Sequence, residues 1–378
     1  MARLELMDRG ILYINTDPAH YHVFASHSHP LQLSRYEFIC TIQRGAGLYA
    51  SDTNIALLRS KDGGESWTEE GFLYSGEADD RPYSYHDGFL SRMEDGTLVV
   101  LAFRADRSDR DRPMFSASGG LIDNDPVLFF SDDGGSSWTG PQIVNLPEGV
   151  VATPTDPVIE LEDGSWLAIF DRWHGWDEEK PFKPRMLGFL SRDRGKTWGD
   201  MVVVADGDAE GKGFWHGKVI RLNDGRLFSM FWSADMTQSE EGPINLPLHY
   251  TFVDNPRMDW PMPQTTGIPG QTHWPVELPD GTVCAVYTMR EADKPGFMCV
   301  LSQDGGKSWN LGEQVRLWDS SGWTHIGISI PDKYPRSHDM IAFGAPTLMA
   351  TMDDELYASW WCTYNSLTHV RWAKLKIV

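Results

Sequence analysis

An eight-residue pattern, Ser-x-Asp-x-Gly-x-Ser/Thr-Trp, occurs four times in this chain of 378 residues and restricts its fold more than any other feature. The copies cover residues 60–67, 131–138, 191–198 and 302–309. In each copy the aspartate can accept hydrogen bonds within its own turn, and the glycine can adopt a positive φ. The final tryptophan is expected to fill the space between neighbouring sheets. Repeats at long intervals indicate an architecture built from one supersecondary unit.

A second series of repeats predicts six β-hairpins. Four of them consist of two apolar runs joined by Asp-Gly, the strongest short-range hairpin signal, and the first and last have other turn residues. Each eight-residue turn follows a hairpin and one further apolar strand, so a full repeat contains four strands. The six hairpins cover residues 31–42, 89–103, 158–170, 219–231, 276–287 and 347–361.

Turns with this pattern are Asp-boxes, and their combination with six hairpins resembles the sialidase (neuraminidase) superfamily over essentially the whole chain. The resemblance implies an all-β, six-bladed β-propeller of four-stranded antiparallel blades, with Asp-boxes in blades 1, 2, 3 and 5. Only one strand, residues 368–377, follows the sixth hairpin, so we expect residues 3–14 to complete the last blade and cover its free edge. No linker divides the chain, which predicts a single domain, residues 1–378.

The charge of the chain excludes several classes of partner. Its formal net charge of −21 disfavours binding to nucleic acid or to an anionic membrane surface. No run of apolar residues is long enough for a membrane span, and the first ten residues contain no signal-peptide core. The four cysteines lie in apolar runs without metal-ligand spacing, which predicts free thiols. We therefore expect a cytoplasmic protein, although a leader removed beforehand would leave the same pattern.

The propeller fold predicts where functional side chains gather. The innermost strand of each blade begins at one rim of the central funnel, and the second strand returns to that rim. Three arginines follow the hairpin turns by nine residues and Arg290 follows its turn by ten, so we expect a set of arginines at the rim. These arginines are Arg44, Arg104, Arg172 and Arg290. The candidates at the starts of the first strands are His29, His86, Asp87, Asp156, Trp215, His216, His273 and Trp274.

These residue types indicate an acidic mono- or oligosaccharide as the ligand. Arginine pairs with a carboxylate through two parallel hydrogen bonds, and exposed tryptophans can stack on a sugar ring. No established metal-ligand spacing is present, so neither a metal nor a cofactor is expected. The sequence makes no prediction of the oligomeric state.

The resemblance also implies a catalytic set: an arginine triad, an aspartate acid/base, and a tyrosine nucleophile paired with a glutamate. Arg44 matches one arginine of the triad, Asp52 lies in the loop of the acid/base aspartate, and Glu210 lies where the glutamate is found. The other positions depart from this pattern, so a standard sialidase is not expected. The first triad arginine is replaced at Ser28-His29-Pro30, the fourth-blade arginine near Ser233, and the tyrosine at residues 343–345.

Three functions are compatible with the sequence. The first is an exo-acting glycoside hydrolase for an acidic sugar, with Asp87 or Asp52 as the general acid and Asp156 or Glu210 as the base or nucleophile. The second is a lyase on uronate-containing glycans, in which His216 or His273 removes the C5 proton. The third is a propeller that binds glycans without catalysis.

Overall fold

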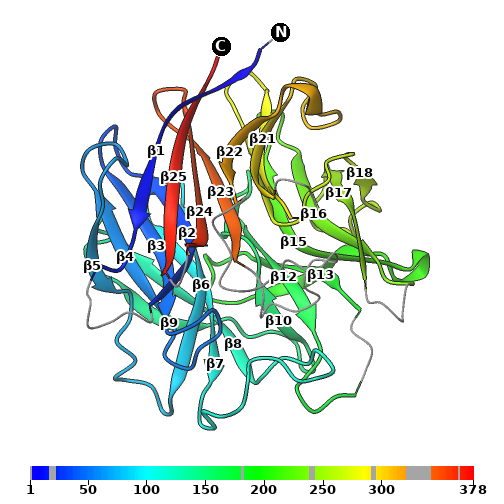
Figure 1. Cartoon of the computed structure of the whole chain (residues 1–378). Coiled ribbons are helices and arrows are strands. Elements are labelled where there is room, and N and C mark those ends of the chain that lie inside the picture. The colour runs from blue at the N-terminus through cyan, green and yellow to red at the C-terminus, as the bar shows by residue number, and fades with distance from the viewer. Residues whose placement is uncertain are drawn as a thin grey trace.

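The strands of this protein form six antiparallel sheets arranged as the blades of a propeller (Figure 1). This arrangement comes from a computed structural model that describes residues 2–16, 23–179, 183–237, 243–290, 295–320, 342–364 and 367–378. It confirms the expected all-β, six-bladed fold with four-stranded blades. Within the described ranges there is no α-helix, and no helix is long and apolar enough to cross a membrane.

The strands follow one another from the centre of each blade to its outer edge, except at the end of the chain. Blades 1 and 2 contain β2 (Phe24–Gln32), β3 (Phe38–Gly45), β4 (Asn54–Ser60), β5 (Thr68–Phe72), β6 (Tyr83–Arg92), β7 (Leu98–Asp106), β8 (Asn124–Ser131) and β9 (Thr139–Ile143). Blades 3 and 4 contain β10 (Val151–Pro154), β11 (Ile159–Glu160), β12 (Trp166–Trp173), β13 (Arg185–Ser191), β14 (Gly199–Asp206), β15 (Lys212–Arg221), β16 (Leu227–Asp235), β17 (Ile244–Val253) and β18 (Gln264–Thr265). Blades 5 and 6 contain β19 (His273–Glu277), β20 (Val283–Met289), β21 (Gly296–Ser302), β22 (Val315–Asp319), β23 (Phe343–Ala350), β24 (Leu356–Tyr364), β25 (Leu367–Ile377) and β1 (Leu4–Tyr13). Two short 3₁₀ turns are η1 (Asp208–Glu210) and η2 (Leu311–Glu313).

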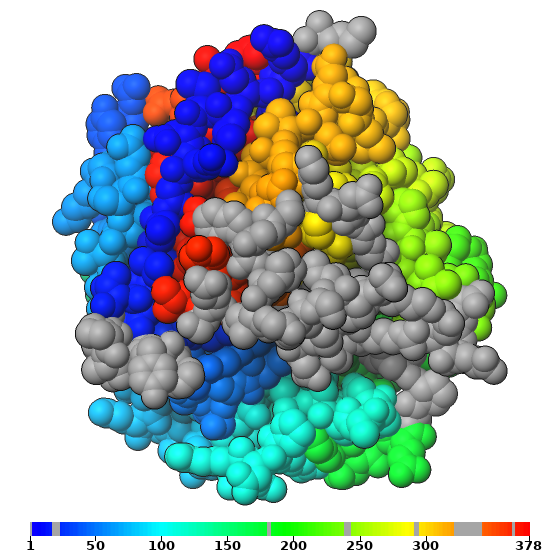
Figure 2. Space-filling view, viewed as in Figure 1, coloured from blue at the N-terminus to red at the C-terminus, as the bar shows by residue number. Residues whose placement is uncertain are grey.

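The two ends of the chain close the propeller together. Strand β1 pairs antiparallel with β25, from Leu4 opposite Ile377 to Tyr13 opposite Val370. Figure 2 shows β1, in blue, lying along the red C-terminal strands. The expectation that the N-terminal strand completes the last blade is thus confirmed, and the outer edge of β25 is paired.

The apolar core lies between neighbouring blades. Leu101 of β7 and Phe170 of β12, for example, belong to one buried cluster between blades 2 and 3. Alternate residues of each strand face opposite neighbours, so the strands are apolar on both faces. The four cysteines are buried and unbridged within this core, as the sequence predicts.

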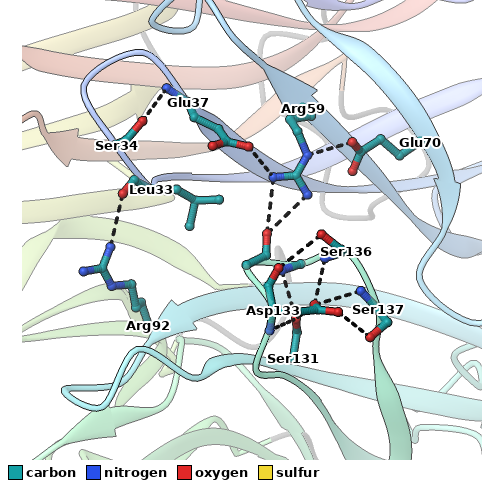
Figure 3. Close-up of polar contacts among 12 residues, drawn as sticks. Leu33, Ser34, Glu37, Arg59, Glu70, Arg92, Ser131, Asp133, Ser136 and Ser137 are labelled. Carbon is teal, nitrogen blue, oxygen red and sulfur yellow. Dashed lines mark hydrogen bonds and ion pairs between the residues drawn. The ribbon is translucent and has the colours of Figure 1, made fainter.

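The four repeated turns lie between the third and fourth strands of blades 1, 2, 3 and 5. Figure 3 shows the copy in blade 2, where Asp133 Oδ1 accepts the backbone N–H groups of Ser136 and Ser137 at 3.0 and 2.9 Å. The hydroxyl groups of Ser131 and Ser137 also donate to Asp133, at 2.8 and 2.6 Å. These hydrogen bonds, those of Ser137 first, lower the pKa of Asp133 to about 2. The aspartate therefore holds the turn together.

The turn of blade 2 is joined to blade 1 by the guanidinium of Arg59 (Figure 3). Arg59 donates to Glu70 at 2.7 Å, to Glu37 at 3.0 Å and to the carbonyl oxygen of Gly134 at 3.3 Å. Its side chain is only 9% exposed, so screening by solvent is weak. These contacts therefore connect the turn of blade 2 to blade 1 and have a structural role.

Two adjacent glycines of this turn test the packing between blades. Both have positive φ, but a Cβ on Gly135 would lie 2.3 Å from Cδ1 of Ile39 in blade 1, whereas Gly134 has open space. We predict that Gly135→Ala lowers the free energy of unfolding by about 1–3 kcal/mol more than Gly134→Ala, because only Gly135→Ala overpacks the blade interface. Urea unfolding of both variants measures the difference. Equal losses would contradict this account of the turn.

Candidate active site

The innermost strands of four blades share a bulge that faces the central funnel. The pairing with the second strand shifts register at the same place in β2, β6, β15 and β23. A non-glycine residue with positive φ occupies each bulge: His27 (47°), Asp87 (68°), His216 (52°) and Ala345 (43°). Bulges redirect side chains, and such backbone strain concentrates at functional sites. All four residues line one pocket.

Two of these bulges donate backbone hydrogen bonds to a side chain on the second strand of the preceding blade. The backbone N–H of Asp87 donates to Oε1 of Gln43 on β3 at 3.0 Å. The backbone N–H of His216 donates to both carboxylate oxygens of Asp171 on β12, at 3.1 and 3.2 Å. Each of these two bulges is therefore fixed by a polar side chain of the neighbouring blade rather than by its own sheet.

The pocket is a cavity of about 110 Å³ in the funnel, bounded by all six blades. A cavity of this size holds several water molecules, and so admits part of a ligand. Second strands contribute Phe103, Asp171, Trp232 and Trp361, the residue after β20 contributes Arg290, and the loop after β3 contributes Tyr49. At or beside the innermost strands, the blades contribute in order His27, Asp87, Thr155, His216, His273 and Ala345.

Two histidine–aspartate pairs lie at this pocket. Nε2 of His27 is 3.8 Å from Oδ1 of Asp87, and Nδ1 of His216 is 3.8 Å from Oδ2 of Asp171. The side chain of His216 is 36% exposed, whereas that of Asp171 is 5% exposed and lies behind it. The side chain of Asp87 is 18% exposed. Asp87 and His216 can therefore be reached from the pocket. Asp171 also lines the pocket, but its side chain is much less exposed there.

Three carboxyl groups, of which Asp87 is half-buried and Asp156 and Asp171 are buried, interact electrostatically with one lysine. Burial raises the pKa of Asp87 and of Asp156 to about 7, and that of Asp171 to about 8, where the charge of Asp87 adds to the effect. Lys218 opposes these shifts, and burial lowers its own pKa. Asp156 accepts the backbone N–H of Val219 at 2.7 Å and lies behind the pocket wall. The cluster therefore retains protons near neutral pH, as general acids require.

The arginines expected at the rim separate into two groups. Arg290 lines the pocket, is buried, and donates to the carbonyl oxygen of Phe343 at 3.1 Å. Arg44, by contrast, pairs with Glu69 and lies over the ring of Phe72 on the outer strand β5. The structure does not bring Arg44 to the funnel lining.

Arg104 and Arg172 also lie outside the pocket lining. Arg104 pairs with Asp125 at 3.0 Å and lies over the ring of Tyr83. Asp171 faces the pocket, and Arg172 is the next residue on β12, so its side chain points to the opposite face. Pocket residues at the second strands follow the hairpin turns by eight or ten residues, whereas Arg44, Arg104 and Arg172 follow by nine. This difference of one residue explains why these three arginines lie outside the pocket lining.

Three of the four candidate histidines at first strands are packed side chains. His29 lines the pocket with its ring 4.6 Å from that of Phe89, and burial lowers its pKa. His273 also lines it, and burial lowers its pKa to about 4. His86 lies just outside, stacked on Phe103 at 5.0 Å, and burial lowers its pKa. All three rings are therefore neutral at neutral pH.

The remaining candidates divide between wall and surface. Trp274 lines the pocket, whereas Trp215 does not and packs against Trp232 at 5.0 Å. Asp52 is exposed and accepts the backbone N–H of Ala46 at 3.0 Å. Glu210 is exposed in η1 and pairs with Lys212 at 2.8 Å. Neither Asp52 nor Glu210 lines the pocket.

Sequence reasoning missed Asp171, Lys218 and Tyr49. Asp171 had a signal, because it follows the turn residue Asp163 by eight residues, in phase with the pocket-facing positions of other blades. Lys218 and Tyr49 had none, since an isolated lysine in a strand or tyrosine in a loop is usually a surface residue. Across the described ranges, no group of three or more histidine, cysteine, aspartate or glutamate side chains could hold a metal ion.

The burial of Asp87 predicts a stability that depends on pH. Its pKa is raised above the unfolded value, so its protonated form favours folding at low pH, and this contribution is lost as pH rises through about 7. Asp87→Asn removes the cost of ionising a buried carboxyl. We expect the variant to gain on the order of 2 kcal/mol over the native protein at pH 8.5, and little at pH 4. Thermal unfolding of both proteins at both pH values measures the stability difference. An equal difference at the two pH values would refute the prediction.

Comparisons with known proteins identify the fold. No protein-family model matches the chain, and no curated protein matches its sequence. A protein of unknown function from Dyadobacter fermentans DSM 18053 has a similar structure, with a TM-score of 0.74 and 17% identity over 99% of each chain. An α-L-arabinanase from Penicillium chrysogenum, complexed with arabinobiose, gives a TM-score of 0.67 and 14% identity over 98% of each chain.

The NanB sialidase from Streptococcus pneumoniae gives a TM-score of 0.62 and 12% identity, over 97% of this chain and 70% of the sialidase chain. At such low identities these similarities concern the fold, and catalytic residues cannot be transferred by position. The resemblance to sialidases that the sequence motifs suggest is confirmed at this level. The chain has the six-bladed propeller fold that sialidases share with this arabinanase.

Proposed function

We propose that the protein is an exo-acting glycoside hydrolase and that the funnel pocket is its active site. The observation that carries this proposal is a pair of carboxyl groups, the half-buried Asp87 and the buried Asp171, at one cavity bounded by all six blades. Glycoside hydrolysis requires one carboxyl group that is protonated and one that is ionised. Two neighbouring carboxyl groups with raised pKa values satisfy this, because ionisation of one opposes ionisation of the other.

The contacts of the two carboxyl groups assign their roles. Asp87 is the more exposed, so it can reach a glycosidic oxygen and donate its proton there as the general acid. Asp171 accepts the backbone N–H of His216 with both oxygens, and this contact favours the ionised form against the larger effect of burial, which raises its pKa to about 8. The proposed role of Asp171 requires its ionised form. In this form it either activates a water molecule or attacks the anomeric carbon itself. Inversion or retention at that carbon distinguishes the two routes.

The shape and charge of the pocket define the proposed substrate. Walls from all six blades fit the end of a glycan better than its middle, which supports exo action. Arg290 and Lys218 are the cations of the described pocket lining, and Arg290 is the candidate partner for a sugar carboxylate. Trp274 and Trp173 offer aromatic faces to a sugar ring. The proposed substrate is therefore a terminal acidic sugar.

One observation favours a lyase as the second candidate. The ring of His216 is exposed to the pocket and lies beside the buried carboxyl of Asp171, an arrangement that suits a general base. A lyase would use His216 to remove the C5 proton of a uronate while Arg290 pairs with its carboxylate. His273 is less suited to this role, because it is buried and its Nδ1 lies 2.9 Å from the carbonyl oxygen of Gln271.

Product analysis tests the proposed reaction. We predict that the protein releases a terminal sugar with the gain of one water molecule, and that Asp87→Asn lowers kcat/KM by about 10²–10⁴-fold through loss of the general acid. Mass spectrometry after incubation with sialyl, uronyl and neutral arabinosyl glycosides measures the products. An unsaturated product without added water would replace the hydrolase with the lyase. Release of neutral sugars alone would retain the hydrolase but refute the acidic substrate, and no turnover on a broad glycan panel would support a binding protein.

Two arginine variants test the carboxylate-binding site. Arg290→Gln should raise KM for an acidic substrate by roughly tenfold to a hundredfold, because a charged hydrogen bond is lost. Arg44→Gln, which removes the pair with Glu69 at the outer strand, should leave KM nearly unchanged. Steady-state kinetics of both variants give the comparison. A large effect of Arg44→Gln with none of Arg290→Gln would instead support the arrangement expected from the sequence.

A further inference from the structure

Lys218 occupies an unusual position at the pocket. It lies on β15 just beyond the bulge of His216, and the residue is only 8% exposed. Its Nζ lies 4.4 Å from the ring centroid of Phe89 and 4.6 Å from that of Trp274. Two aromatic faces therefore stabilise a buried ammonium group that has lost most of its hydration.

Three carboxyl groups from three segments lie near this ammonium: two line the same pocket, and the third accepts the backbone N–H of the residue after Lys218. They are Asp87 on β6, Asp156 after β10 and Asp171 on β12, and the positive charge of Lys218 favours the ionised form of each. Among the described residues, no carboxylate oxygen of these three lies within 4.0 Å of Nζ of Lys218. Lys218 thus acts on the cluster as a whole rather than neutralising one partner.

The other titratable groups that face Lys218 do not add charge. These are His29 on β2 and His273 on β19, and burial, assisted by the charge of Lys218, lowers the pKa of both rings. Near neutral pH they are uncharged. The ammonium is therefore the cation that counters the three carboxyl groups within this part of the pocket.

The hydrogen bonds of the three carboxyl groups differ. Asp156 accepts the backbone N–H of Val219, and Asp171 accepts that of His216, so both have donors that favour ionisation. The carboxyl group of Asp87 has His27 as its neighbour, at 3.8 Å. Hydrogen bonding therefore favours ionisation of Asp156 and Asp171, although burial still raises the pKa of Asp171 to about 8, above the value of about 7 for Asp87.

We propose that Lys218 is a positioning residue that sets the number of protons shared by Asp87, Asp156 and Asp171. The catalytic use of these protons rests on the proposed hydrolase function. The electrostatic part concerns only the folded protein, and can be tested without substrate.

The test is a titration of the aspartate carboxyl groups by ¹³C NMR in protein labelled at aspartate Cγ. Removing the cation in Lys218→Met should raise the highest carboxyl midpoints by about one pH unit or more, since ionisation loses its counter-charge. Lys218→Arg, which retains the charge, should titrate like the native protein. The matched control is Lys212→Met on the same strand, whose lysine pairs with the exposed Glu210. Unchanged midpoints in Lys218→Met would overturn the proposal.

A second variant covers the case in which Lys218→Met does not fold. The double variant Lys218→Met/Asp156→Asn removes one buried carboxyl together with the cation, and is compared with Asp156→Asn alone. The remaining midpoints should again lie about one unit higher in the double variant, and equal midpoints would refute the role of Lys218. If the native protein cleaves a glycoside, the alkaline limb of its kcat/KM profile should move with the NMR midpoints. Shifted midpoints without any turnover would refute the hydrolase and leave the effect of Lys218 on the carboxyl groups intact.

Discussion

The hydrogen bond from the backbone N–H of His216 to Asp171 connects the propeller to the chemistry of its pocket. It fixes a strained bulge on the innermost strand of blade 4 with a carboxylate from the second strand of blade 3. Both residues line the pocket, where the side chain of His216 is partly exposed and that of Asp171 is buried. A comparable bond from Asp87 to Gln43 joins blades 1 and 2. The orientation of the reactive groups therefore depends on how neighbouring blades dock.

Burial of carboxyl groups at the funnel opposes the stability that the rest of the fold provides. The cores between blades and the repeated turns at their outer edges stabilise the ring, whereas ionising Asp87, Asp156 or Asp171 in a buried place costs free energy. Lys218 offsets part of this cost, although its own burial is unfavourable. Such a conflict between local stability and chemistry is expected at a functional site, where strain and perturbed pKa values are maintained by the surrounding structure.

Two kinds of sequence signal differ in how directly they determine the structure. Turn residues, such as the Asp133 group, act within a few positions of the chain, so their pattern identifies the turn directly. The side of a strand to which a side chain points is harder to predict. Successive residues of a strand point to opposite sides, so an error of one position reverses the assignment. The nine-residue spacing therefore predicts Arg172 at the pocket, although its neighbour Asp171 is the residue that lines it. Arg290, ten residues beyond its turn, was the arginine in phase with the pocket.

By itself, the sequence determined the fold class, the number of blades and the closure of the ring by strand β1, because these follow from local turns and alternating strands that repeat along the chain. It also identified several residues of the pocket wall, among them Asp87, His216 and Trp274. Only the tertiary structure decided which side chains meet. The bulges, the ammonium of Lys218 and the carboxyl groups come from five separate blades, and the charges of the lysine and the carboxyl groups interact only after docking has removed them from water.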